Sequence, residues 1–298
     1  MPDRTPVAPS TIENHRALIV ESEVELNRLL ADMLKKEQWE VRFAASNEQA
    51  LELAKAQPFD LIVTGVHSSG IEDVELLRRL RLVRPHTRLI IMTDEFTPGD
   101  VLAAIRERAF SYFSRPFSQE KLAEMIRIAM HEAFWDDGIE VLSATPNWVR
   151  LCVRCDLVTA NRLLQFYREA STLPAAETEE VAAAFREILV NAMEHGAKFD
   201  PSQHVEVSYV RTRHMVMCRV KDPGQGFSLE ELQHSALGNP EDDPFKHMKM
   251  REAQGKRPGG FGILMAKRLV DELIYNEKGN EVLLVKYLDG RETVPSPS

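Results

Sequence analysis

The sequence has few cysteines, no long apolar run and no excess of basic residues. Three cysteines in 298 residues are too few for a disulfide framework, which favours a reducing compartment. No apolar run reaches the roughly 20 residues that a membrane-spanning helix needs, and the polar, Pro-rich start is unlike a signal peptide. The net charge of −9 argues against a general nucleic-acid binder. We therefore expect a cytoplasmic protein that contacts neither membrane nor nucleic acid directly.

The hydrophobic content of the chain is enough for ordinary globular cores. Hydrophobic residues make up 44% and charged residues 28% of the chain, and its length favours about two domains. Asp136, Asp137 and Gly138 end a helical pattern, so we place a boundary there. The predicted parts are a disordered start (1–14), a first domain (15–137), a second domain (138–290) and a disordered tail (291–298).

The first half alternates short apolar strands with helical patterns. Strands are expected at 16–20, 40–45, 60–63, 89–93 and 111–117, and helices at 24–37, 47–56, 74–85, 100–109 and 119–135. Strands that are joined by helical crossovers form a parallel sheet with helices on both faces. The first half is therefore predicted to be an α/β domain.

The second half has a different pattern. A strand (139–144) and a helix (161–170) come first, followed by a long helix that ends in glycine (179–196). Two hairpins (205–222 and 272–288) flank a polar stretch and a further helix (262–273). This order predicts helices packed on one face of a mostly antiparallel sheet.

The long helix carries a polar stripe on an otherwise apolar surface. Glu187, Asn191 and Glu194 are spaced i, i+4 and i+7, which places them on one side of a helix. A buried carboxylate and amide cost several kcal/mol unless something pairs with them. A divalent cation with its phosphates would supply that pairing, and a solvated or capped stripe is the alternative.

Two glycine-containing segments follow. DPGQGF (222–227) comes directly after a strand, and Asp222 offers a carboxylate that could accept a hydrogen bond from an exocyclic amine. RPGGFG (257–262) opens a helix, where free N–H groups favour phosphate. The first segment alone is a weak signal, because ordinary turns look similar.

In this order and spacing, the motifs EILVNAMEHG, DPGQGF and GGFG resemble the N box and the two glycine boxes of the GHKL ATPase superfamily. The resemblance covers about residues 139–287 and is greatest to the anti-sigma-factor serine kinases. It implies an α+β sandwich of the Bergerat type with ATP and Mg²⁺ as cofactors. It assigns Mg²⁺ binding to Asn191 and the role of base to Glu187. The nucleotide-binding residues that it implies are Asn191, His195, Asp222, Gly224, Gly226, Arg257, Gly259, Gly260 and Gly262.

By this resemblance the second half would be a serine/threonine protein kinase. Its substrate would be a small antagonist protein whose hydroxyl loses its proton to Glu187, and a sigma factor and a second copy of the chain are further expected partners. The segment 242–257 would be a mobile lid, although a solvated loop explains its charges equally well. Two alternatives stay open: an ATP-gated binding module without phosphoryl transfer, and the catalytic ATPase domain of a two-component histidine kinase.

The first half, over about 15–130, resembles a response-regulator receiver domain with a flavodoxin-like, doubly wound sheet. The segment VESE (20–23) aligns with the acidic pair of that family, so Glu21 and Ser22 occupy the two positions of the pair. Thr93 matches the hydroxyl position, Arg115 replaces the family's lysine, and Gly65 occupies the phosphoacceptor position.

A receiver with glycine at the acceptor position lacks a nucleophile. Asp60 lies about 16 Å away along the strand, and strand alternation points Thr64 to the other face. His67 and Ser68 are near but lack acidic neighbours for a metal. We therefore expect a pseudo-receiver, kept as a dimerisation surface or a dock for an upstream partner.

Two weaker signals are discounted. Cys152 and Cys155 form a CxxC pair without a second pair to complete a tetrahedral zinc site, so buried neutral thiols are expected. His131 and Glu132 resemble a phosphoacceptor box, but no helical hairpin follows them before Gly138. A surface histidine is the preferred interpretation.

Overall fold

The computed structural model describes residues 15–21, 23–65, 69–94, 97–131, 137–145, 147–226 and 261–288. These residues form two compact units. The first draws on Met1–Asp94 and Arg115–Trp135, and the second on Glu95–Ser114 and Asp136–Ser298. Residues 95–114 therefore group with the second unit, although the sequence pattern assigns them to the first domain. The predicted disordered ends lie outside the described residues.

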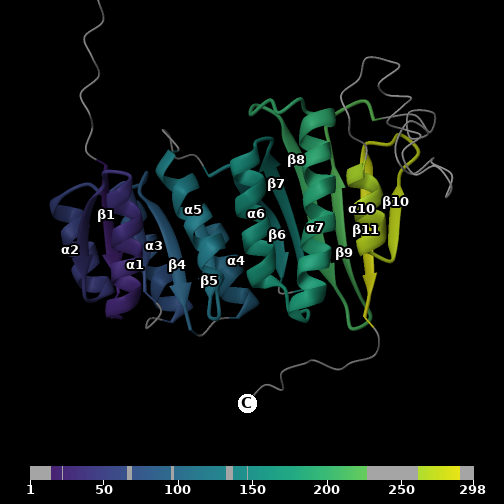
Figure 1. The fold of residues 1–298 in the computed structure, drawn as a ribbon. Coiled ribbons are helices and arrows are strands. Elements are labelled where there is room, and N and C mark those ends of the chain that lie inside the picture. The colour runs from purple at the N-terminus through teal and green to yellow at the C-terminus, as the bar shows by residue number, and fades with distance from the viewer. Residues whose placement is uncertain are drawn as a thin grey trace, which may run out of the picture. The chain divides into compact units, whose positions relative to one another are not determined.

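A five-stranded sheet carries the first half of the chain. Its strands are β1 (Arg16–Val20), β2 (Glu40–Ala44), β3 (Leu61–Thr64), β4 (Arg88–Thr93) and β5 (Ser111–Ser114). They follow the order β2-β1-β3-β4-β5, with parallel pairing of β1 to β2 and β3 and of β3 to β4 (Figure 1). β3 and β4 are buried along their whole length, as is typical of strands between two helical layers. The doubly wound sheet is confirmed.

In the described residues, four helices connect these strands and a fifth follows β5. They are α1 (Val24–Lys36), α2 (Asn47–Ala56), α3 (Gly70–Val83), α4 (Pro98–Arg106) and α5 (Gln119–His131). Helix α3 begins four residues earlier than predicted, because Ser69 and Glu72 form a capping box. The Ser69 side chain accepts a hydrogen bond from the Glu72 N–H group, and the Glu72 carboxylate accepts one from the Ser69 N–H group.

A six-stranded antiparallel sheet carries the second half. Its strands are β6 (Ile139–Thr145), β7 (Trp148–Arg154), β8 (His204–Arg211), β9 (Met215–Lys221), β10 (Glu272–Tyr275) and β11 (Glu281–Tyr287), in the order β10-β11-β9-β8-β7-β6. The sequence pattern did not predict β7. Val149, Leu151 and Val153 of this strand are buried and alternate with more exposed side chains, which is the pattern of a half-buried strand.

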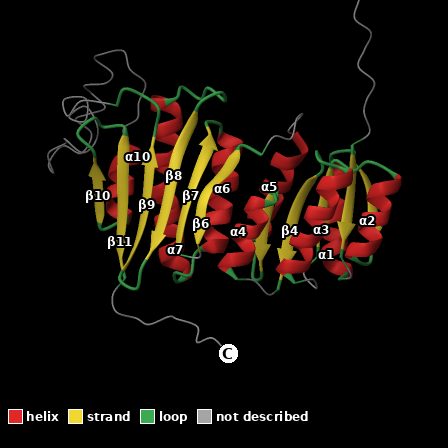
Figure 2. Ribbon diagram, turned by 180° about the vertical axis from the view of Figure 1, so that it is seen from behind, coloured by secondary structure: helices red, strands yellow, loops and turns green. Residues whose placement is uncertain are grey.

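The described helices of the second half of the chain lie on one face of its sheet. Figure 1 shows α6 (Leu157–Ala170), α7 (Ala175–Asn191) and α10 (Phe261–Leu269) in front of the strands, and Figure 2 shows the same sheet uncovered from behind. Helix α7 continues into a π-helical turn, η1 (Ala192–Gly196). This arrangement confirms the predicted layers and gives the sheet its core on the helical side.

Candidate functional site

Glu187 and Asn191 lie on the last turns of α7. The helix buries seven residues: Thr178, Val181, Ala182, Ala184, Phe185, Ile188 and Leu189. Glu187 and Asn191 are one turn apart and half-buried. The Glu187 side chain is 30% exposed, and its Oε1 atom lies 3.6 Å from Arg186 Nη1. A carboxylate and an amide are thus held side by side within reach of solvent.

The π-helical turn η1 ends the predicted polar stripe. Glu194 and His195 lie in this turn, and both are exposed. Glu194 therefore does not share the half-buried surroundings of Glu187 and Asn191. π-helical turns within helices occur frequently at functional sites.

Gly262, at the start of α10, faces the same pair of side chains. A Cβ atom at Gly262 would lie 2.5 Å from Glu187 Oε2 and 3.7 Å from Asn191 Nδ2. Helix α10 packs along α7, so the absence of a side chain lets the first turn of α10 approach the carboxylate. Backbone N–H groups at a helix start favour phosphate. The structure therefore brings the first half of the first motif and the end of the third motif together.

Asp222 lies in a cradle formed by two glycines. A Cβ atom at Gly196 would lie 2.3 Å from Asp222 Oδ1, and one at Gly224 would lie 2.8 Å from the same oxygen. The Gly224 N–H group donates a hydrogen bond to Asp222 Oδ1 at 2.8 Å. Burial raises the pKa of the Asp222 carboxyl above its ordinary value, although the Gly224 hydrogen bond and Lys278 act in the opposite direction.

The turn between β10 and β11 holds the backbone of Asp222 through hydrogen bonds. The Asp222 N–H group donates to the Asn280 carbonyl at 3.0 Å, and Asn280 Nδ2 donates to the Asp222 carbonyl at 3.2 Å. Lys278 Nζ donates to the Gly224 carbonyl at 3.1 Å. Gly226 has a φ of +78°, and a Cβ atom there would lie only 1.8 Å from the Lys278 carbonyl oxygen. Only glycine satisfies both conditions at this position.

Sequence reasoning missed Asn280 and Lys278. The available signal was the position of the turn NEKGN (276–280), which precedes the strand that pairs with β9. Arg257, Gly259 and Gly260 lie outside the described residues, as does the predicted lid 242–257.

At the carboxyl end of β3, the surroundings of Gly65 are filled by β1. A Cβ atom at Gly65 would lie 2.5 Å from Glu21 Oε2 and 2.6 Å from the Val20 carbonyl oxygen. Glu21 is buried, and its Oε1 atom accepts a hydrogen bond from the Glu23 N–H group at 2.7 Å. Neither alanine nor aspartate fits at position 65 unless β1 shifts.

The Thr64 hydroxyl belongs to a buried network. It donates to Asp73 Oδ2 at 3.2 Å and accepts from the Met92 N–H group at 3.2 Å. Asn47 Nδ2 donates to the other oxygen of Asp73 at 3.0 Å. Thr64 thus contacts α3, whereas Gly65 faces Glu21.

Arg115 takes part in ion pairs at this end of the first sheet. Its guanidinium contacts the Glu23 carboxylate, and its Nε atom lies 3.3 Å from Asp94 Oδ1. Thr93, at the end of β4, is buried. Ser22, His67 and Ser68 lie outside the described residues.

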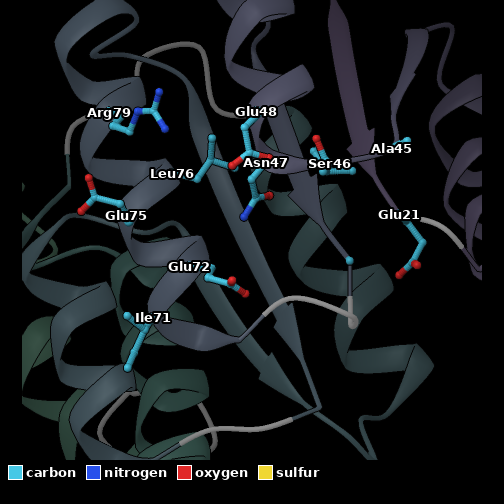
Figure 3. Close-up of a pocket in the computed structure, with 12 residues that line it drawn as sticks. Glu21, Ala45, Ser46, Asn47, Glu48, Ile71, Glu72, Glu75, Leu76 and Arg79 are labelled. Carbon is cyan, nitrogen blue, oxygen red and sulfur yellow. The ribbon is translucent and has the colours of Figure 1, made fainter.

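A cavity of about 490 Å³ opens beside Gly65 in the first unit (Figure 3). Its lining combines Glu21 with residues from the start of α2 and from α3, among them Glu48, Glu72 and Arg79. The candidate nucleotide site belongs to the second unit, so this cavity is a separate feature.

The cysteines of the second unit are free thiols. Cys155 and Cys218 are buried, and burial raises the pKa of both to about 12. Burial also raises the pKa of Cys152. Among the described residues, no group of three or more His, Cys, Asp or Glu side chains is arranged to hold a metal ion.

Family models match both halves of the chain. Residues 17–127 match the response regulator receiver domain, and residues 154–286 match the histidine kinase-like ATPase domain. The chain therefore joins a receiver domain to a histidine kinase-like ATPase domain.

Similar proteins are known for part of the chain. It is 26% identical over 115 residues to the sporulation initiation phosphotransferase F of Bacillus subtilis (strain 168), which covers 38% of this chain and 92% of that protein. It is 29% identical over 121 residues to the uncharacterized transcriptional regulatory protein YkoG of the same organism, which covers 41% of this chain and 53% of that protein. A CheY-like receiver domain protein from Methanospirillum hungatei JF-1 aligns with a TM-score of 0.35 at 24% identity, over 38% of this chain and 90% of that chain.

Within the described residues, no helix has the length and apolar character to cross a membrane.

The residues of the second unit fit an adenine nucleotide and Mg²⁺. The glycine cradle leaves the Asp222 carboxylate uncovered by neighbouring Cβ atoms, which suits an acceptor for an amine. The Asn191 amide oxygen is a ligand type that Mg²⁺ accepts, and this ion usually takes only one or two protein ligands in addition to phosphates and waters.

Proposed function

We propose that the chain is an ATP- and Mg²⁺-dependent serine/threonine protein kinase of the anti-sigma-factor type, which phosphorylates a small antagonist protein. The receiver half is not itself phosphorylated and serves regulation or dimerisation. One observation carries the proposal. Glu187, Asn191 and Gly262 meet at the start of α10, and Asp222 lies in its glycine cradle at the end of β9.

Each site residue has a role that follows from its chemistry. The Asp222 carboxylate accepts a hydrogen bond from the exocyclic amine of adenine, an interaction of about 1.5–3 kcal/mol for a charged acceptor. Gly224 and Gly226 would let the backbone approach the base, and Asn191 would hold the ion. Mg²⁺ neutralises phosphate charge when it is bound. His195, Arg257, Gly259, Gly260 and Gly262 are proposed to complete the nucleotide site.

Glu187 is the proposed catalytic base. Its carboxylate is partly exposed and lies beside the first turn of α10, so a hydroxyl that enters from solvent can reach it. Proton acceptance from a serine or threonine of the partner needs a carboxylate at this position. Nucleotide binding alone does not need one. We place the reaction in the cytoplasm, with a sigma factor and a second copy of the chain as further partners.

A labelling reaction tests the proposal. The protein, its Glu187→Gln variant and the matched Glu194→Gln control are incubated with γ-labelled ATP, Mg²⁺ and an extract of the source organism. We expect an acid-stable labelled partner with the wild type and the control, and none with Glu187→Gln. An acid-labile label on the chain itself would favour the histidine kinase alternative. Nucleotide binding without label, in the presence of a purified antagonist, would favour the ATP-gated binding module.

A further inference from the structure

Helix α6 contacts the outer edge of β5 with polar side chains. β5 is the last strand in the order of its sheet, so within the part of the chain that the structure describes one of its edges pairs with no strand. Gln165 Nε2 donates a hydrogen bond to the Tyr112 carbonyl at 3.0 Å, and Glu169 Oε2 accepts one from the Ser114 N–H group at 3.0 Å. Both helix residues and both strand residues belong to the second unit.

Arg162 extends this row of contacts. Its Nε atom donates to the Phe110 carbonyl at 2.8 Å, and its Nη2 atom donates to the Ala109 carbonyl at 3.0 Å and to Asp137 Oδ1 at 2.7 Å. The guanidinium carbon lies 5.1 Å from the centre of the Phe110 ring. The side chain is 1% exposed, and a buried charge of this kind is tolerated only when it is paired.

These contacts follow the spacing of a strand. Phe110, Tyr112 and Ser114 are every second residue of the β5 segment, and their backbone groups are the ones that a further strand would bond. Arg162, Gln165 and Glu169 are spaced by three and four residues, which places them on one side of α6. Three side chains therefore take the place of a sixth strand and cover an edge that would otherwise be open to pairing.

Helix α6 also packs against α7, the helix that carries the candidate catalytic residue. The rings of Tyr167 and Phe185 lie 5.8 Å apart, and the hydroxyls of Ser171 and Thr178 lie 3.1 Å apart. Phe185 is two residues before Glu187 on α7. One helix thus links the β5 edge to the candidate nucleotide site.

We propose that α6 couples the β5 edge to the candidate nucleotide site. In this proposal the β5 edge stays bound to α6, and the stability of the α4–β5 segment is linked to nucleotide binding beside α7. The nucleotide part rests on the proposed function. Coupling between two sites is reciprocal. A nucleotide that orders α7 must therefore slow the opening of β5, and a change that loosens β5 must weaken nucleotide binding.

Hydrogen exchange of the full chain tests the coupling. We compare the wild type, Glu169→Gln and the matched Glu180→Gln control, each with and without Mg²⁺ and a non-hydrolysable ATP analogue. Glutamine at 169 keeps the size of the side chain but loses the charged acceptor. Glu180 undergoes the same change on α7, where its partner is Lys286 at 3.1 Å.

In the wild type and the control, we expect the analogue to slow exchange at 109–114 as well as on α7. In Glu169→Gln, exchange without ligand should rise both at 109–114 and on α7, and affinity for the analogue should fall about fivefold. Faster exchange confined to 109–114, with unchanged affinity, would overturn the coupling. If the wild type binds no analogue, the proposed function fails, and the exchange of α7 in the ligand-free variant still decides the coupling.

Discussion

Two glycines of this chain, Gly65 and Gly262, stand in matching positions beside a glutamate. In each case a Cβ atom would lie 2.5 Å from the Oε2 atom of that glutamate, Glu21 in the first unit and Glu187 in the second. The next neighbours differ. At Gly65 the second contact is the Val20 backbone carbonyl at 2.6 Å, whereas at Gly262 the further contacts are side-chain atoms, Glu187 Cδ at 3.5 Å and Asn191 Nδ2 at 3.7 Å.

This difference separates a position where an added side chain would meet backbone from one where it would meet only side chains. A backbone carbonyl within a sheet cannot rotate away, so the space at position 65 is filled by β1 itself. Side chains can rotate, so Glu187 and Asn191 can turn toward a nucleotide that approaches α10. A missing side chain therefore does not by itself make room for a ligand.

The largest expected effect concerns Glu187. Glu187→Gln should lower the rate of phosphoryl transfer by about 10²–10⁴-fold, because general-base catalysis is lost, while nucleotide affinity stays close to that of the wild type. Single-turnover kinetics with purified antagonist measure the rate. An equal loss in the exposed Glu194→Gln control would show that charge on this helix, rather than proton acceptance, is responsible.

Asp222→Asn should weaken nucleotide binding by about 10- to 150-fold, since a hydrogen bond to a charged acceptor contributes about 1.5–3 kcal/mol. Competition between ATP and GTP analogues should also become less selective. Calorimetric titration gives both quantities. Asp200→Asn, at an exposed position, serves as the control, and unchanged selectivity in Asp222→Asn would remove this residue from base recognition.

The first unit gives the next prediction. Gly65→Asp should remain unphosphorylated by a small-molecule phosphodonor and should lower the free energy of unfolding by about 1–3 kcal/mol, as overpacked sites do. Denaturant titration and intact-mass measurement test both parts. Phosphorylation of the wild-type first half would refute the pseudo-receiver hypothesis, and a Gly65→Asp variant of unchanged stability would refute the steric clash at position 65.

The smallest expected effect is a pH dependence. Because the pKa of Asp222 is raised in the folded state, its contribution to stability is present at low pH and is lost as pH rises through that pKa. Relative to Asp222→Asn, the wild type should thus gain stability as pH falls. Asp200 should show the opposite sign, because hydrogen bonds from Ser202 lower its pKa. Unfolding curves at pH values on both sides of 3.8, the ordinary pKa of an Asp carboxyl, distinguish the two signs: the Asp222 contribution changes above that pH and the Asp200 contribution below it. Parallel curves for the wild type and Asp222→Asn would contradict the assignment.

The sequence predicts elements whose signals are local. Helix α2 lies at 47–56 as expected, because Ser46 caps it and its apolar residues recur at helical spacing. Strand β7 was missed although its apolar residues alternate, because its other positions carry arginine, cysteine and tryptophan.

Contacts between distant segments could not be predicted in this way. The grouping of 95–114 with the second unit reflects contacts of α4 and β5 with α6 and β6, among them the hydrogen bonds of Arg162. Contacts between segments so far apart in the sequence leave no periodic signal. The closeness of the Val20 carbonyl to Gly65 appears only once β1 and β3 are paired. The support that Asn280 gives to Asp222 likewise appears only once β9 and β11 are paired.

The most direct test of the central claim is a calorimetric titration of Gly196→Ala with Mg²⁺ and a non-hydrolysable ATP analogue, beside the wild type and Gly65→Ala. The new Cβ atom would lie 2.3 Å from Asp222 Oδ1 and must displace that carboxylate. We predict binding by the wild type and by the folded fraction of Gly65→Ala, and loss of binding in a folded Gly196→Ala. Binding that survives in Gly196→Ala, or that is lost only in Gly65→Ala, would contradict the placement of the nucleotide site at Asp222.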